Sequence, residues 1–177
     1  QIIGLGPGHF LVAAPGMDQE PFTQAVLLIL NHDVNFTQAV VVNRPFSKEQ
    51  IEAQLQELRS MATWLQSRTQ IPEYLILWTQ TKALLGLAMR SSTEARLGGD
   101  VGVFDRQAPL PDFMSVLHPF GEVPGASLLL SGTGEKSHPD LFLNGDLEKL
   151  HAAAERDVDK KVLLFRGYAG WGPQQLA

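Results

Sequence analysis

The N-terminal part of the chain carries three short apolar runs separated by polar turns. Phe10–Ala14 is the first, and Ala25–Leu30 follows as an unbroken run rich in Val, Ile and Leu, which is typical of a strand covered on both faces. Asn31–Asn35 is polar, and Thr37–Val42 is apolar again. The pattern predicts one strand followed by a β-hairpin over residues 25–42.

A helix is predicted shortly after this β-hairpin. Ser47-Lys48-Glu49-Gln50 has the form of a capping box, with Ser at the N-cap and Gln at the third helical position. Apolar residues then recur at helical spacing, at Ile51, Leu55, Leu58, Ala62 and Leu65. The other side of this stretch is mainly polar, so we expect an amphipathic helix that covers a sheet.

A second apolar stretch begins at Pro72. Tyr74–Trp78 and Ala83–Met89 are apolar, and the polar segment Thr79–Lys82 separates them. A membrane span needs about 20 mostly apolar residues, so these runs are too short and too interrupted, and no transmembrane segment is predicted.

In the second half of the chain, short apolar runs alternate with turns. Strands are predicted at Phe113–Leu117, Ala126–Leu130, Leu141–Leu143 and Val162–Phe165, the last as a central strand. Asp146 is expected to cap a helix over Leu147–Arg156. Gly98 and Gly99 indicate a bulge or a close approach between strands.

The last strand runs into a segment of glycines and aromatic residues. Glycine permits a left-handed or crowded backbone, while Tyr168 and Trp171 carry large aromatic rings that are usually buried. No cofactor or reaction uses this pattern in general, so it predicts a structural corner. Its motif residues are Gly167, Tyr168, Gly170, Trp171, Gly172 and Pro173. Pro173 also fits the first position of a helix continued by Gln174–Leu176.

Composition narrows the function classes. With 177 residues, 44% of them hydrophobic, the chain is long enough for one domain with a full core. The net charge of -5, with Lys160-Lys161 as the only basic pair, disfavours nucleic acid as a partner. The absence of cysteine excludes disulfides, Fe–S clusters, thiolate zinc sites and a cysteine nucleophile.

The sequence shows no pattern for a catalytic, metal or cofactor site. Its five histidines have no zinc-site spacing, and no Gly-x-Ser-x-Gly element occurs. Gly134-Glu135-Lys136-Ser137 approaches a phosphate-binding loop, but Glu135 separates Gly from Lys, and His138-Pro139 interrupts the helix that should follow. We therefore predict no catalytic residue, no metal and no cofactor.

Several segments, in the same order, resemble the AlgH/YqgE family. Gly167–Leu176 is similar to its "GYAGWGPGQL" signature. The other matches are Phe10–Pro15, Phe22–His32 and Val40–Pro45 to its N-terminal block, Leu97–Val101 to "GGPV", and Val116–Pro119 to "VLHP". The resemblance implies one AlgH-like domain over residues 1–177, with an α+β fold whose mixed β-sheet is covered by helices. It implies no established reaction; links to regulation have been proposed for the family.

The chain also departs from that family. The interval between Arg44-Pro45 and Gly98-Gly99 is longer than usual, which indicates an inserted helical segment at about 46–96. The insertion holds Trp64, Tyr74 and Trp78, which are candidate partner-binding residues, because it is either extra core or an exposed anchor for a protein or a membrane surface. The family's usual C-terminal extension is missing, and this divergence favours a processed organellar chain over a bacterial cytoplasmic one.

Asn43-Arg44-Pro45 closes the second strand of the predicted β-hairpin. As a cap, Asn43 would accept backbone hydrogen bonds and Pro45 would end strand pairing. As an anion site, the Arg44 guanidinium would receive a carboxylate or a phosphate. We favour the cap. Because the family's polar positions recur here, Asn43, Arg44 and His118 remain candidate ligand-binding residues.

Three functions follow from these patterns. The first is a non-catalytic interaction module, an accessory or structural subunit that docks onto other protein subunits through the aromatic insertion, and it is compatible with a peripheral membrane contact. The second is a small-molecule-binding regulatory protein, or an enzyme without a recognisable motif, with a pocket near Asn43, Arg44 and His118. The third is a transcription-linked regulator, which the net charge disfavours.

Overall fold

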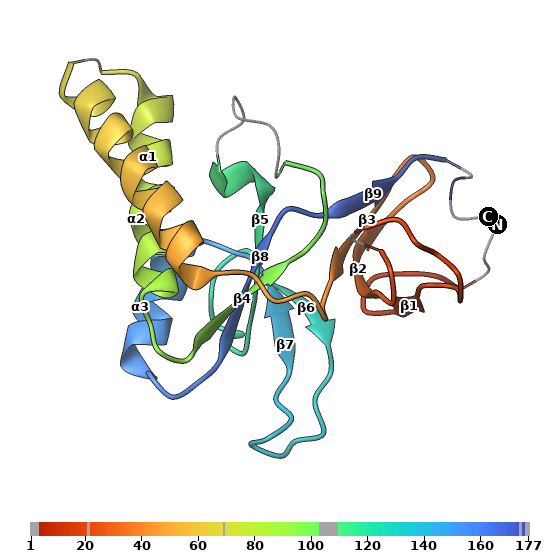
Figure 1. The fold of residues 1–177 in the computed structure, drawn as a ribbon. Helices are drawn as coiled ribbons and strands as arrows, with labels where there is room; N and C mark the ends of the chain where they lie inside the picture. The colour runs from red at the N-terminus through yellow and green to blue at the C-terminus, as the bar shows by residue number, and fades with distance from the viewer. Residues whose placement is uncertain (1–3, 21, 69, 103–109, 174, 176–177) are drawn as a thin grey trace.

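The protein has an α+β fold in which helices lie on one side of two packed sheets (Figure 1). A computed structural model describes residues 4–20, 22–68, 70–102, 110–173 and 175. The described residues form three α-helices, one short 3-10 helix and nine strands.

The first sheet has four strands and is antiparallel throughout. It consists of β1 (Phe10–Val12), β2 (Val26–His32), β3 (Thr37–Val41) and β9 (Ala169–Trp171), in the order β1-β2-β3-β9. The predicted β-hairpin over residues 25–42 is confirmed. Its turn is shorter than predicted because β2 continues through Asn31 and His32, which pair with Gln38 and Thr37. Within the turn, the Asp33 carboxylate accepts hydrogen bonds from the backbone N–H groups of Asn35 and Phe36, at 2.7 and 2.9 Å.

The second sheet has five strands and is mixed. It consists of β4 (Thr93–Leu97), β5 (Met114–His118), β6 (Ser127–Leu130), β7 (Leu141–Leu143) and β8 (Val162–Arg166), in the order β4-β8-β5-β7-β6. β4 and β8 are parallel, and the other pairs are antiparallel. The predicted strands of this half are confirmed, and β8 lies inside the sheet. The helical segment expected at about 46–96 ends earlier, because its last residues form β4.

All three α-helices pack on the five-stranded sheet. They are α1 (Lys48–Arg68), α2 (Pro72–Ala88) and α3 (Leu147–Arg156), and the 3-10 helix η1 spans Leu110–Phe113. Buried residues of these helices and of β4, β5 and β8 form one hydrophobic cluster. The predicted starts of α1 and α3 are confirmed. Ser47 Oγ accepts from the Gln50 N–H at 3.2 Å, and Asp146 Oδ1 accepts from the Lys149 N–H at 2.9 Å.

The four-stranded sheet packs against the other face of the five-stranded sheet. Leu28, Leu30 and Val40 of the first sheet meet Leu117 and Phe165 of the second in one buried cluster. A second cluster covers the opposite face of the four-stranded sheet, which explains why the β2 run is apolar at successive positions. The expected mixed sheet covered by helices is therefore present, and a second, antiparallel sheet completes the core.

The C-terminal motif crosses from one sheet to the other. Gly167 takes a left-handed φ of 77°, and the chain continues into β9 beside β3. The corner packs against Gly98 and Gly99, where an added Cβ atom would lie less than 3.0 Å from the backbone of residues 167–169. The expected close approach of strands at the two glycines is thus confirmed. Pro173 lies in a turn; Gln174 and Leu176 of the expected helix lie outside the described residues.

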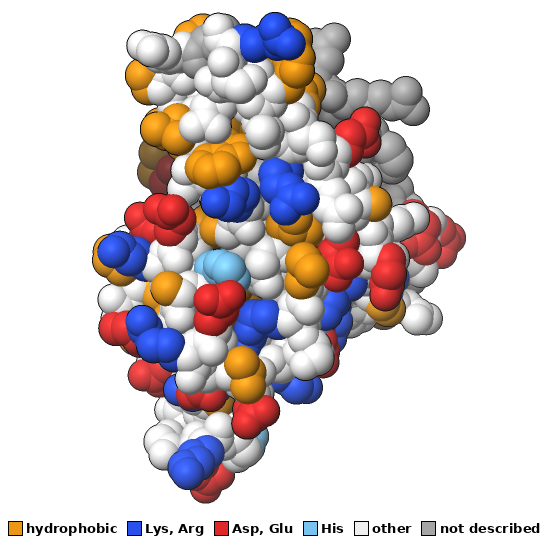
Figure 2. Space-filling model, turned by 90° about the vertical axis from the view of Figure 1, so that its left-hand side faces the viewer, with side chains coloured by type: hydrophobic (Ala, Val, Ile, Leu, Met, Phe, Trp, Pro, Cys, Tyr) orange, Lys and Arg blue, Asp and Glu red, His pale blue; other side chains and the backbone are white. Residues whose placement is uncertain are grey.

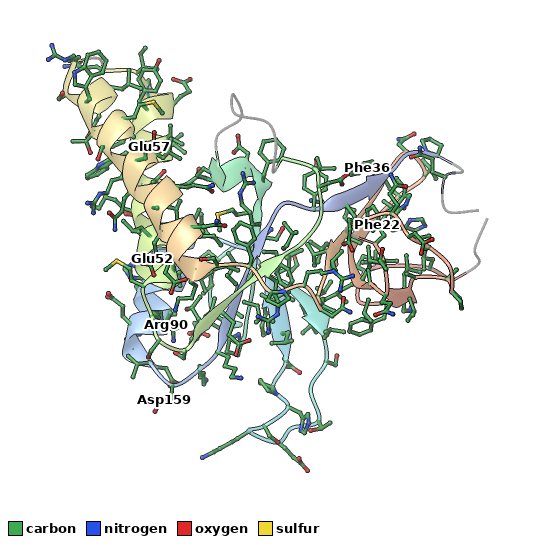
Figure 3. All side chains as sticks on the ribbon, viewed as in Figure 1. Phe22, Phe36, Glu52, Glu57, Arg90 and Asp159 are labelled. Carbon is green, nitrogen blue, oxygen red and sulfur yellow. The ribbon has the colours of Figure 1, made fainter. Side chains whose placement is uncertain are left out.

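Aromatic side chains fill the space around this corner. The Tyr168 ring stacks on Phe113 and meets Phe36 edge to face, with ring centroids 6.2 and 6.5 Å apart. Trp171 contacts Phe22. Figure 3 shows Phe22 and Phe36 beside the strands of the first sheet. The motif joins the two sheets through packing, as expected for a structural corner.

Candidate functional site

Helices α1 and α2 form a helical hairpin that projects from the body of the molecule, on the side away from the four-stranded sheet (Figure 1). Its far end carries exposed large apolar side chains, which we call the hairpin tip. They are Met61, Trp64, Ile71, Leu75 and Ile76, each between 43% and 56% exposed. Figure 2, which views this side of the molecule, shows hydrophobic side chains gathered at its upper end, with most charged side chains below.

The near end of the same helical hairpin is core. Thr81 and the five apolar residues that follow it in α2 before the C-cap are buried, namely Ala83, Leu84, Leu85, Leu87 and Ala88. The sequence left open whether this segment is core or exposed surface, and the structure shows both. The base of the helical hairpin is core, and its tip is exposed apolar surface.

The three predicted partner-binding aromatic residues occupy different positions on this helical hairpin. Trp64 is 56% exposed at the tip, with the Arg68 guanidinium 4.8 Å from its ring centroid. Trp78 is half-buried and links the two helices, because its Nε1 donates to Thr63 Oγ1 at 3.1 Å. Tyr74 is half-buried near the start of α2. Of the three, Trp64 presents the largest accessible ring to a partner.

A cleft of about 540 Å³ opens beside the tip, between α2 and the N-terminal end of α3. Its apolar wall includes Leu75, Ile76 and Leu84 of α2 together with Met114 and Val116 of β5. Its polar lining includes Thr79, Gln80, Asp112, Asn144, Asp146 and Glu148. Leu75 and Ile76 belong to both the tip and the cleft, so the two features form one continuous surface.

Carboxylates determine the charge of the cleft. Asp112, Asp146 and Glu148 are exposed, and the described residues that line the cleft include no Lys, Arg or His. None of the three carboxylates takes part in an ion pair within the described part of the chain. Across the same residues, no group of three or more His, Asp or Glu side chains could hold a metal ion. The lining therefore favours an organic cation with an apolar portion.

His118 lies directly behind this cleft. It is fully buried, its Nε2 donates to the Asn144 carbonyl at 2.7 Å, and its Nδ1 accepts from the Phe120 N–H at 3.2 Å. A carbonyl can only accept and an amide N–H can only donate, so these bonds require the neutral Nε2–H tautomer. Burial lowers the pKa of His118 below its ordinary value of 6.5, and the Asn144 carbonyl opposes that shift less strongly.

The lowered pKa of His118 predicts a loss of stability in mild acid. Because the folded state binds this proton less readily than the unfolded chain, the free energy of unfolding falls as pH drops below about 6.5, by up to about 1.4 kcal/mol per pH unit. We expect His118→Gln, which keeps one donor and one acceptor, to reduce this slope in urea titrations at pH 7.5 and 5.5. His138→Gln, at an exposed histidine, should leave it unchanged; equal slopes for the two variants would contradict the assignment.

Asn43 and Arg44 act as a cap on the four-stranded sheet. Asn43 Oδ1 accepts from the Val26 N–H, and its Nδ2 donates to the Gln24 carbonyl, both at 2.9 Å. Arg44 donates to the Thr23 carbonyl, and its Nε lies 3.9 Å from Glu20. These contacts support the cap interpretation for Asn43 and Arg44. The expectation that Pro45 ends strand pairing is wrong, because Pro45 forms an antiparallel bridge with Arg96 of β4, and the Arg44 carbonyl, which needs no N–H of proline, accepts from the Leu97 N–H at 2.9 Å. The contacts of Asn43 and Arg44 involve none of the residues around His118, and neither Asn43 nor Arg44 lines the cleft.

The cleft residues were not singled out as a site by the sequence. Asp112, Asn144 and Glu148 come from η1, from the β7–α3 connection and from α3, and only the fold brings them to one place. A partial signal was present at Asn144-Gly145-Asp146, where a turn passes directly into a helix cap. His118 was predicted as a ligand-binding residue, but it does not line the cleft. It contacts the cleft residue Asn144 from the buried side, through the hydrogen bond to the Asn144 carbonyl.

The architecture and sequence both have known counterparts. The AlgH-like family model (DUF179) matches residues 10–177. Among curated proteins, a UPF0301 protein of Pseudomonas fluorescens is 29% identical over 168 residues, covering 95% of this chain and 68% of the relative. A UPF0301 protein of Methylococcus capsulatus is 24% identical over 168 residues, covering 95% of this chain and 69% of the relative.

Two solved structures share the fold. A Corynebacterium diphtheriae protein matches with a TM-score of 0.53 and 21% identity, covering 97% of this chain and 69% of that chain. The solution structure of the AlgH protein from Pseudomonas aeruginosa matches with a TM-score of 0.51 and 24% identity. The match covers 95% of this chain and 68% of the AlgH chain. At these identities the structural matches establish the fold alone.

Proposed function

The chain belongs to the AlgH-like family, and on that premise we propose that it is a non-catalytic interaction module, an accessory or structural subunit that binds another protein through the hairpin tip. The observation that carries this proposal is the cluster of exposed large apolar side chains at the end of a projecting helical hairpin. Contiguous apolar patches on soluble proteins commonly mark sites of protein or membrane interaction.

The construction of the helical hairpin supports this proposal. Its base is anchored by buried α2 residues and by Ile51 and Leu55 of α1. Trp78 and Thr63 tie the helices together nearer the tip. A rigid support reduces the conformational entropy lost on binding, so the tip can contact a partner without refolding. No described helix is long and apolar enough to cross a membrane.

A small-molecule-binding regulatory protein is the second candidate. The cleft volume of about 540 Å³ lies within the range typical of ligand pockets, about 300–1,000 Å³. Its place differs from the sequence-based prediction. His118 lies one residue layer behind it, and the Asn43–Arg44 cap belongs to the other sheet.

The proposal predicts a large effect of Trp64→Ala on partner binding. Aromatic residues at the centre of interfaces often contribute at least about 2 kcal/mol, which corresponds to roughly thirtyfold in affinity. A tagged full-length chain would be purified from its source, the stoichiometric partner identified by mass spectrometry, and its affinity for the purified chain measured by calorimetry. We expect Trp64→Ala to weaken binding by that factor.

Phe10→Ala is the matched control, because Phe10 is a similarly exposed aromatic residue on the four-stranded sheet, at 53%. It should bind the partner as the parent chain does. A chain that elutes alone from its source, or a partner that binds Trp64→Ala with unchanged affinity, would refute docking through the tip.

A further inference from the structure

We propose that the cleft beside the hairpin tip binds a basic amphipathic segment of the partner protein. Lys or Arg side chains of that segment would face Asp112, Asp146 and Glu148, and its apolar side chains would pack on Leu75 and Ile76. This inference rests on the proposed interaction function and specifies the chemistry of the partner.

Charge complementarity is the reason for expecting Lys or Arg side chains in the bound segment. The three carboxylates line one cleft, and the described residues that line it include no basic side chain and give these carboxylates no ion pair. Placing an acidic segment there would bring like charges together, whereas guanidinium or ammonium groups would form hydrogen-bonded ion pairs. The chain's net charge of -5 also favours the approach of a basic segment.

The N-terminus of α3 does not convert this cleft into an anion site. The Asp146 side chain already accepts from the Lys149 N–H at 2.9 Å. Asp146 and Glu148 place two negative charges at the end of the helix, where a phosphate or a carboxylate would otherwise be favoured. An anionic ligand would have to overcome that repulsion.

Apolar side chains beside the carboxylates are the reason for expecting the bound segment to be amphipathic. Leu75 and Ile76, about half-exposed, form the border between cleft and tip, and Leu84, Met114 and Val116 lie deeper in the same lining. A segment that inserts basic side chains among the carboxylates would therefore also cover Leu75 and Ile76, the part of the tip that borders the cleft. Helical segments bind grooves in this way, with apolar anchors on one face and charges beside them.

The chemistry can be tested with three synthetic peptides of about 15 residues, a length that supports partial helix. All share the same leucine positions, and the variable positions carry Arg, Gln or Glu. Binding of each fluorescein-labelled peptide to the full chain would be followed by fluorescence anisotropy. We expect the Leu/Arg peptide to bind at least about tenfold more tightly than the Leu/Gln peptide, and the Leu/Glu peptide to bind most weakly.

The double variant Asp112→Asn/Glu148→Gln removes two cleft charges and leaves the Asp146 cap intact. We expect it to weaken Leu/Arg binding about tenfold or more. Glu57→Gln/Asp159→Asn is the matched control, with the same change of charge at exposed positions on α1 and in the α3–β8 connection, away from the cleft lining (Figure 3). It should bind the Leu/Arg peptide as the parent chain does. A photo-reactive Leu/Arg peptide should cross-link to residues 75–76 and 112.

The outcomes separate this inference from the proposed function. Equal binding of the Leu/Arg and Leu/Gln peptides, or equal losses in the two double variants, would refute a basic segment while leaving tip docking in place. Cross-linking outside the cleft would do the same. If Trp64→Ala leaves the natural partner's affinity unchanged while Asp112→Asn/Glu148→Gln abolishes Leu/Arg binding, tip docking fails and the cleft stands as a cation-binding site for a small molecule.

Discussion

Gly99→Ala should destabilise the fold by about 3 kcal/mol, the upper end of the usual cost of overpacking. An added Cβ atom would lie less than 3.0 Å from the Tyr168 carbonyl carbon and oxygen and from the Ala169 nitrogen, and all three are backbone atoms. A side chain could rotate away, but these atoms belong to the corner between β8 and β9. That corner is held by reciprocal hydrogen bonds between the backbones of Val101 and Tyr168, at 3.0 and 3.3 Å. Relief of the clash therefore requires the two sheets to shift.

The measurement is urea unfolding followed by far-UV circular dichroism and tryptophan fluorescence. Gly6→Ala is the matched control, because Gly6 has an ordinary φ and no atom lies within 4 Å of the added Cβ. It should change the free energy of unfolding by no more than about 0.5 kcal/mol. If Gly99→Ala unfolded at the same urea concentration as Gly6→Ala, the close approach of the two backbones would be wrong.

The hydrophobic pattern predicted most of the strands, and local side-chain chemistry predicted both helix caps. The pattern failed to identify two strands, β4 and β9, and the residues of β9 were predicted as part of a structural corner. β4 is the longer of the two. Thr93-Glu94-Ala95-Arg96-Leu97 does alternate with a period of two, but two of its five residues are charged. On the edge of the sheet those charges pair with each other, because Arg96 donates to Glu94 at 2.5 Å. An edge strand can carry charges that a central strand could not.

The division of α2 into core and tip could not be predicted from its sequence. Leu75 and Ile76 are as apolar as Leu84 and Leu85, yet the first pair is exposed and the second buried. The helix is apolar around much of its circumference, so no polar stripe distinguishes the covered end from the uncovered one. Burial is decided by where the five-stranded sheet and α3 end, which is a property of the tertiary fold. The cleft depends on the same geometry.

Asn144 holds the junction behind the cleft. It has a left-handed φ of 53°, and its backbone N–H donates to the Val116 carbonyl while its Oδ1 accepts from the Val116 N–H, both at 2.8 Å. Its carbonyl accepts from His118. The amide side chain thus continues the pairing of β5 and β7 at the point where the backbone turns toward α3. Asn is suited to this position because it tolerates left-handed φ and can form such local bonds.

Asn144→Ala should therefore cost about 3 kcal/mol of unfolding free energy. About 1–3 kcal/mol comes from leaving the buried Val116 N–H unpaired, and about 1 kcal/mol from placing alanine in the left-handed region. Asn144→Gly loses the same hydrogen bond without the backbone strain, so it should be about 1 kcal/mol more stable than Asn144→Ala in the same urea titration. Alanine and glycine variants of equal stability would show that φ is relaxed at this position. Two variants as stable as the parent chain would show that the Val116 bond contributes nothing, and the support of the cleft would have to be sought elsewhere.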